Sequence, residues 1–158
     1  MMEIIMAKTY SVKRVAEIFG LSVSALHFYD KKGLLPFVSK NEMGYRIFTD
    51  SDLNFIHTIC CLKDTGMKID NIRSYIEFCM EGPTTINKRR QLLEEHRRKI
   101  EEQQRVLAER KQEVDEKLSI YRSKDAAEII NHEINYVSAE KSSVNLKNPF
   151  AKLQNGRQ

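Results

Sequence analysis

The chain of 158 residues has few of the features on which enzymes and membrane proteins depend. No apolar run approaches the roughly 20 residues that span a bilayer, and the first six residues are too short for a secretory signal. There is no glycine-rich phosphate loop, metal triad or supported nucleophile–base pair, apart from His57 and Cys61. We therefore expect a cytoplasmic protein with reduced thiols and no cofactor, which is not an enzyme and has no membrane partner.

The net charge of +4 is also small. A charge of this size is weak evidence for a nucleic-acid partner, whereas Lys and Arg clustered on one module are better evidence. The length allows one compact domain plus an extension.

Residues 10–35 predict two short helices joined at Gly20. Ser11 and Ser22 are suited to be N-caps, because their side-chain oxygens accept free backbone N–H groups at a helix start. Gly33 suits the left-handed conformation that ends a helix. Such a helix-turn-helix commonly places its second helix in the major groove of DNA.

The second helix has an apolar arc and a mixed arc. The apolar arc, predicted to pack on the first helix, holds Val23, Ala25, Leu26 and Tyr29, and the opposite arc holds Ser24, His27, Phe28 and Lys31. A phenylalanine among polar residues indicates contact with a groove or a partner. The alternative is a small helical domain in which Phe28 packs under a neighbouring loop.

Two short apolar runs, 34–38 and 45–48, predict the strands of a hairpin after these helices. Pro36 limits the first run to an edge strand, and Asn41 with Gly44 suits the turn. A basic hairpin here is a wing, able to place Lys40, Tyr45 and Arg46 along phosphates.

Two further helices follow the wing. Thr49, with Asp52 at N3, predicts the capped start of a helix that runs to Gly66, and a fourth helix spans about 69–81.

Over residues 9–122 the chain resembles the MerR family of bacterial transcription regulators. The matching positions are Ser22–Val23, Leu26, Phe28–Asp30, Gly33–Leu35, Gly44–Arg46, Asp52–Leu53 and Leu62–Gly66. The resemblance implies a mainly all-α fold: a winged helix-turn-helix DNA-binding domain with a β-hairpin wing, then a long dimerising coiled-coil helix. The predicted DNA-binding residues are Tyr10, Ser11, Ser24, His27, Phe28, Tyr29, Lys31, Lys40, Tyr45 and Arg46.

Two positions, His27 and Phe28, depart from the family pattern. Family members usually have arginine at His27, tyrosine at Phe28, and arginine or a polar residue at Ser24. His27 can still hydrogen-bond a base, and Phe28 keeps apolar contact, for example with a thymine methyl. The operator that is recognised is therefore not given by the resemblance.

An apolar residue recurs every seventh position after Gly82-Pro83, with Thr85 as the expected N-cap. This row consists of Ile86, Leu93, Ile100, Leu107, Val114 and Tyr121. The second row of a coiled coil is thin, so a lone helix would be marginal and must bury its stripe elsewhere. Similar proteins pair these helices antiparallel between subunits, which predicts a homodimer. We expect domains at 9–82 and 83–123, and a tail at 124–158 that is weakly helical and then disordered from residue 138.

The three cysteines differ in their predicted positions. Cys60 and Cys79 lie on apolar helix faces, whereas Cys61 lies on a polar face one turn after His57. An imidazolium there would favour the reactive thiolate, although the helix C-terminus opposes it. The alternative is ordinary packing of Cys61 at a dimer interface.

The segments 61–67 and 81–86 and the short tail are similar to the branch of the family that responds to aldehydes and nitrosative stress. This similarity implies Cys61 as the sensor, with His57 as its modulator. Metal-sensing relatives use cysteines at the start of the dimer helix and beyond it, and this chain has none after Cys79.

The resulting hypothesis is a homodimeric regulator that binds a pseudo-palindromic promoter. The family mechanism implies activation by DNA distortion, with RNA polymerase affected through the DNA. The alternatives are a ligand-responsive MerR-type regulator with structural cysteines, and a coiled-coil adaptor protein that binds no DNA. Lys40 and Arg46 argue against the adaptor.

Overall fold

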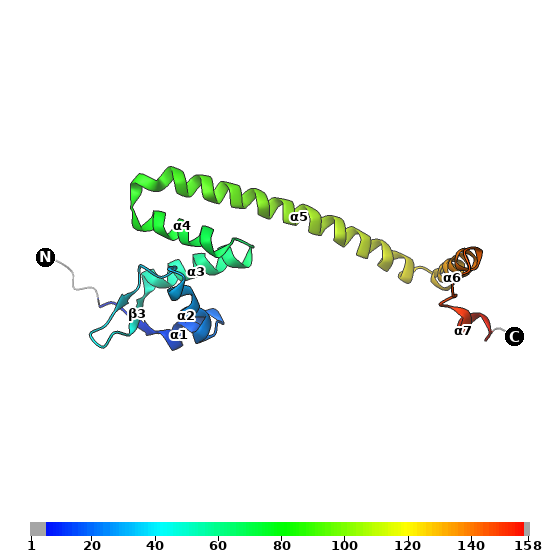
Figure 1. The fold of residues 1–158 in the computed structure, drawn as a ribbon, viewed down its shortest axis with the longest axis horizontal. Coiled ribbons are helices and arrows are strands. Elements are labelled where there is room, and N and C mark those ends of the chain that lie inside the picture. The colour runs from blue at the N-terminus through cyan, green and yellow to red at the C-terminus, as the bar shows by residue number, and fades with distance from the viewer. Residues whose placement is uncertain (1–5, 157–158) are drawn as a thin grey trace. The chain divides into compact units, whose positions relative to one another are not determined.

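The computed structural model describes residues 6–156, which form helices and one small sheet (Figure 1). The first five residues of the segment considered as a possible signal lie outside this range. In chain order the elements are β1 (Thr9–Ser11), α1 (Val12–Phe19), α2 (Val23–Lys31), β2 (Ser39–Lys40), β3 (Arg46–Thr49), α3 (Asp50–Asp64), α4 (Ile69–Met80), a 3₁₀ turn (Pro83–Thr85), α5 (Ile86–Arg122), α6 (Ala126–Ser143) and α7 (Ala151–Gln154). The predicted mainly helical fold, with a winged helix-turn-helix followed by a long helix, is confirmed.

The two helices of the helix-turn-helix begin and end where the sequence indicates. Ser11 Oγ accepts the N–H of Arg14 at 3.2 Å, and Ser22 Oγ accepts that of Ala25 at 3.0 Å. Gly20 ends α1 with φ 64°, a left-handed conformation that costs glycine little. The predicted apolar faces meet in the core, where Val15, Ala16, Leu26 and Tyr29 are buried, whereas Val23, predicted for the same face, is 37% exposed because it lies in the first turn of α2.

The sheet has three antiparallel strands in the order β1-β3-β2. Strand β1 was not predicted, because its three residues show no alternation that could be recognised. It pairs Tyr10 with Phe48, and β2 pairs Ser39 with Ile47.

The first wing strand begins later than expected. The prediction placed it at 34–38, but Leu34, Leu35 and Val38 are buried in the core and the strand is Ser39–Lys40. The prediction was wrong because it took an apolar run for a strand when the run is core-filling loop. The turn was predicted correctly: Asn41 N–H donates to Tyr45 O at 2.9 Å, and Gly44 has φ 84°.

Helices α3 and α4 complete the core. The backbone N–H of Thr49 donates to Asp52 Oδ2 at 2.8 Å, which is the predicted capping arrangement at the start of α3. Ile56 and Ile59 of α3 and Ile72 and Ile76 of α4 are fully buried in the same cluster. Both helices end within two residues of the predicted positions.

The first turns of α5 belong to this compact unit. Leu92 and Leu93 pack against its core, and His96 is buried. The unit therefore extends to Glu101, and a second unit begins at Glu102. The predicted domain boundary at residue 82 rested on the break at Gly82-Pro83. This break separates α4 from α5 in sequence, but the first turns of α5 still pack against the core.

Arg89 joins the end of α4 to the start of α5. Its Nη2 donates to Phe78 O at 3.0 Å and Gly82 O at 2.6 Å, and its Nε donates to Thr85 Oγ1 at 3.1 Å. Thr85 is buried, and its hydroxyl lies within hydrogen-bond distance of two acceptors, Phe78 O, which is the nearer, and Gly82 O at 2.9 Å. These bonds satisfy carbonyls that a helix end leaves free.

The tail contains more helix than predicted. Residues expected to be disordered from 138 onward continue α6 to Ser143 and form α7. Ser138 Oγ donates to Ile134 O at 2.7 Å, and Leu146 N–H donates to Lys141 O at 2.8 Å. The prediction took a polar composition for disorder, whereas here the polar groups bond within the segment.

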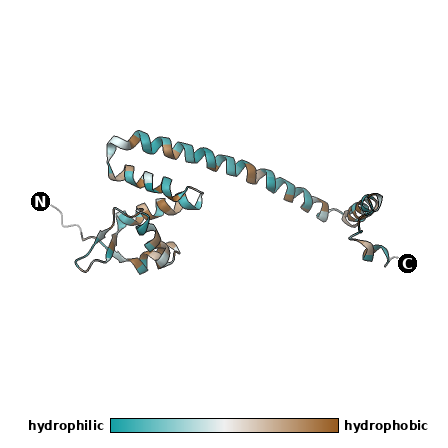
Figure 2. Ribbon diagram, viewed as in Figure 1, coloured by the Kyte–Doolittle hydropathy of each residue, from teal (hydrophilic) through white to brown (hydrophobic). Residues whose placement is uncertain are grey.

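The hydropathy of the helices is shown in Figure 2. Within residues 6–156 no helix combines the length and the apolar character that crossing a membrane requires.

We expect Arg89→Ala to lower the free energy of unfolding by about 2–3 kcal/mol, since it removes several charge-assisted hydrogen bonds to partly buried groups at the α4–α5 junction. Arg90→Ala is the matched control, because Arg90 is exposed and makes only a 3.8 Å ion pair with Glu94. That control should change stability by less than about 0.5 kcal/mol. Urea denaturation followed by circular dichroism measures both, and equal losses would contradict the assigned role of Arg89.

Candidate nucleic-acid interface

The outer face of α2 is exposed in the part of the chain that the structure describes. Ser24, His27 and Lys31 are exposed, and 45% of Phe28 is exposed. Phe28 therefore does not pack under a loop, as the alternative interpretation required. The Lys32 ammonium nitrogen lies 5.7 Å from the centre of the Phe28 ring, so a cation accompanies this apolar surface.

Tyr29 is not available for DNA. Its side chain is 1% exposed and lies in the core, with Lys63 Nζ 5.2 Å from its ring centre. Its place among the predicted DNA-binding residues was wrong, because it belongs to the apolar arc of α2 that faces α1.

An ion pair connects α2 with the wing. Arg46 Nη2 lies 2.8 Å from Asp30 Oδ1, and Arg46 Nε lies 3.1 Å from Asp30 Oδ2. Arg46 Nη1 also donates to Val38 O. The two side chains are 25% and 28% exposed, so the pair is partly shielded from water. A bidentate pair of this kind fixes geometry as well as contributing energy.

Sequence reasoning assigned Arg46 to phosphates and gave Asp30 no role. In the structure the guanidinium is held by groups of the protein itself. Asp30 and Arg46 both lie in segments that match the family. The match does not show that these two side chains contact each other.

The remaining predicted residues lie at the surface of the same module. Lys40 and Tyr45 are exposed on the wing. Tyr10 donates its hydroxyl to Asp50 Oδ1 at 2.7 Å, and this hydrogen bond raises the pKa of Tyr10. Ser11 is engaged as the cap of α1, so its side chain has a structural role.

The cysteines of α3 have different environments. Cys60 is partly buried against the core, and burial, followed by the charge of Asp64, raises the pKa of its thiol. Cys61 and His57 are exposed on the other side of the helix, as predicted. Cys79 of α4 is half-buried and free. Its neighbour Tyr75 has a raised pKa, caused first by burial and then by Cys79.

A polar contact missed by sequence reasoning joins α3 to α5. His96 Nε2 lies 2.7 Å from Thr65 Oγ1, and Thr65 Oγ1 lies 2.7 Å from Cys61 O. A hydroxyl has one proton and a carbonyl only accepts, so both contacts are satisfied when Thr65 donates to Cys61 O and His96 Nε2–H donates to Thr65. His96 lies three positions after Leu93 of the apolar row, where a coiled coil would have an apolar residue, and the sequence has no signal for its burial.

This arrangement of two capped helices, an exposed recognition face and a wing defines a winged helix-turn-helix DNA-binding module. Residues 10–79 match the family profile described as MerR HTH family regulatory protein, and residues 53–117 match that described as MerR, DNA binding. The chain belongs to the MerR family of DNA-binding transcription regulators. These relatives are regulators and not enzymes.

Three relatives illustrate the similarity. An uncharacterised HTH-type transcriptional regulator of Haemophilus influenzae is 37% identical, over 75% of this chain and 87% of its own. The HTH-type transcriptional regulator AdhR of Bacillus subtilis is 29% identical, over 57% of this chain and 64% of its own. HiNmlR, a MerR family regulator lacking the sensor domain, was solved bound to promoter DNA; it is 38% identical with a TM-score of 0.69, over 76% of this chain and 94% of its own.

The Arg46–Asp30 pair gives a prediction that separates the two basic residues of the wing. Arg46→Ala should weaken operator binding with little change in its salt dependence, because this guanidinium is paired within the protein. Lys40→Ala should weaken binding and lower the slope of log K against log salt by about one. Fluorescence anisotropy titrations over a range of salt concentrations measure both slopes. A slope reduced equally by both substitutions would place Arg46 on a phosphate.

Proposed function

We propose that this chain is a homodimeric regulator that distorts promoter DNA in response to an electrophile, which it senses through Cys61. The observation that supports the response most directly is the exposure of Cys61, beside a partly buried Cys60, on a helix of the DNA-binding module.

The proposed dimer is supported by the apolar row on α5. Leu107 is 70% exposed, and Ile86, Val114 and Tyr121 are also mostly exposed. On a helix with so many charged residues, apolar side chains of this size favour burial against a partner. Leu93 and Ile100 are half-buried, and Leu93 already contacts the core of its own chain. The row predicted for dimerisation therefore divides into an intrachain part and a part available to a second copy.

A two-fold dimer requires a two-fold related site, so the promoter would be a pseudo-palindrome. The proposed switch is deformation of the DNA between the half-sites, which would affect RNA polymerase without a protein contact. HiNmlR is a regulator that lacks the sensor domain, and 94% of its chain matches 76% of this one. The matching region includes the DNA-binding module. By analogy, we place the sensing group within this matching region.

Two features of the surroundings of Cys61 support its proposed role as sensor. Its thiol is exposed, and the exposed His57 lies one turn earlier on the same side of α3. The backbone carbonyl of Cys61 is bonded to Thr65, which contacts His96 of α5. Addition of a group to the sulfur at this point would alter a helix end that is hydrogen-bonded to the proposed dimer helix. A thiolate is the nucleophilic form in any such reaction.

Leu107→Asp should convert the proposed dimer into monomers, because it places an unpaired charge in the apolar row that the dimer would bury, at a cost of several kcal/mol. Operator affinity should fall with it, since a monomer holds one half-site. Gln112→Asp is the control, because residue 112 lies about 140° around the helix from Leu107. Sedimentation equilibrium measures the association state, and a dimeric Leu107→Asp variant would show that the subunits meet elsewhere.

Cys61 should react with iodoacetamide faster than Cys60 or Cys79 in the folded protein, and His57→Ala should slow it if the imidazole favours the thiolate. Mass spectrometry of the labelled peptides measures the three rates. In a promoter assay, Cys61→Ser should lose induction by an electrophile and retain DNA binding, whereas Cys79→Ser should keep both. Normal induction of Cys61→Ser would show that the thiol is not the sensor.

A further inference from the structure

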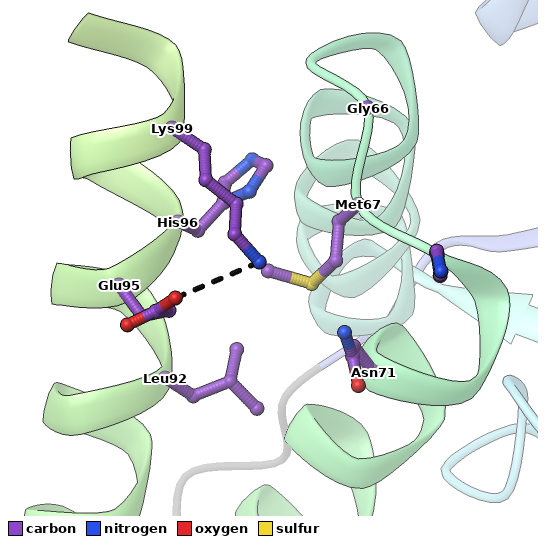
Figure 3. Close-up of a pocket in the computed structure, with 8 residues that line it drawn as sticks. Gly66, Met67, Asn71, Leu92, Glu95, His96 and Lys99 are labelled. Carbon is purple, nitrogen blue, oxygen red and sulfur yellow. Dashed lines mark ion pairs between the residues drawn. The ribbon is translucent and has the colours of Figure 1, made fainter. Parts of the chain in front are cut away.

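A cleft of about 400 Å³ lies between the turn that joins α3 to α4 and the first turns of α5 (Figure 3). Its wall includes Gly66, Met67, Lys68 and Asn71 on one side and Leu92, Glu95, His96 and Lys99 on the other. All of these residues belong to the first compact unit. The volume is in the range of pockets that hold small organic molecules.

The cleft is formed by ordered groups of both elements. His96 is 6% exposed and is held by Thr65, and Met67 is buried in the core. Figure 3 shows the Met67 and Leu92 side chains on opposite sides of the space, with the Asn71 amide facing it. A ligand would therefore meet an apolar surface and a hydrogen-bonding group together.

The charge of the cleft favours an anion. Lys68 and Lys99 contribute two ammonium groups, and Glu95 contributes one carboxylate. Glu95 lies 3.7 Å from Lys99 but also accepts a hydrogen bond from Arg98 at 3.0 Å. Arg98 is the first cause of the lowered pKa of Glu95, and Lys99 is the second. Because this single carboxylate is shared between two cations, it does not fully compensate Lys99.

We propose that this cleft binds a small organic acid, with its carboxylate at Lys68, Lys99 and Asn71 and its apolar body between Leu92 and Met67. Lysine and amide N–H groups donate to a carboxylate, and the bonds from the lysines are charge-assisted. Binding does not require a reactive Cys61, whose side chain does not line the cleft. The bound acid would lie beside His96, which is hydrogen-bonded to Thr65. Thr65 is in turn hydrogen-bonded to the backbone carbonyl of Cys61.

Benzoate titrated into the full-length protein tests the proposal, with benzamide as the neutral isostere and inorganic phosphate as an anion without an apolar body. We expect benzoate alone to shift the ¹H–¹⁵N resonances of Gly66–Lys68 and Asn71 in a saturable manner. Lys68→Gln should weaken this binding by roughly fivefold or more, as expected for loss of one charged contact. Lys13→Gln, on the exposed surface of α1, should leave it unchanged.

Binding of benzamide as tight as that of benzoate would overturn the anion site, and equally tight phosphate would overturn the requirement for an apolar body. Absence of saturable benzoate shifts would overturn the site altogether. Cys61→Ser should bind benzoate like the unmodified chain, so failure of the proposed thiol sensor and failure of this cleft give different results. Leu92→Phe, which fills the cleft from an apolar wall, should also abolish binding while preserving the helical circular dichroism spectrum.

Discussion

The orientation of the wing relative to the recognition helix depends on one ion pair, that between Arg46 and Asp30. A short two-stranded hairpin has little stability of its own, and this wing contributes few buried side chains beyond Phe48. The guanidinium provides the missing restraint by binding α2 through Asp30 and the wing approach through Val38 O. The ion pair thereby fixes the orientation of the wing relative to the outer face of α2, and both surfaces must contact the same DNA duplex. Strand β1 adds to this restraint by covering the other edge of β3.

Much of this fold could be predicted because its local signals agree with each other. Ser11, Ser22 and Thr49 are helix-start residues in front of apolar periodic segments, and the structure uses all three in that way. Agreement between capping, turn and periodicity is what makes an assignment reliable. The outer arc of α2 followed from the same periodicity.

The errors arose where a residue type or an apolar run suits two structural environments equally well, and where a contact joins residues far apart in sequence. Tyr29 is aromatic and polar at its tip, so it suits both a core and an interface, and only packing shows that it is buried. The run 34–38 is apolar enough for a strand but fills the core as a loop. The contacts of Arg46 with Asp30 and of His96 with Thr65 were not foreseen, because the partners are 16 and 31 residues distant in sequence. No local pattern reports contacts of that separation.

The ion pairs along α5 have a consequence for how the proposed dimer assembles. Arg105 contacts both Glu102 and Glu109, at 2.6 and 2.5 Å, and Lys111 contacts Asp115 at 2.7 Å. Each such exposed pair contributes only a few tenths of a kcal/mol, but together they favour the helical state before any partner arrives. The subunits would then associate as preformed rods, and little backbone entropy would remain to be lost on encounter. Association of this kind is a docking event whose rate is set by diffusion and orientation rather than by folding.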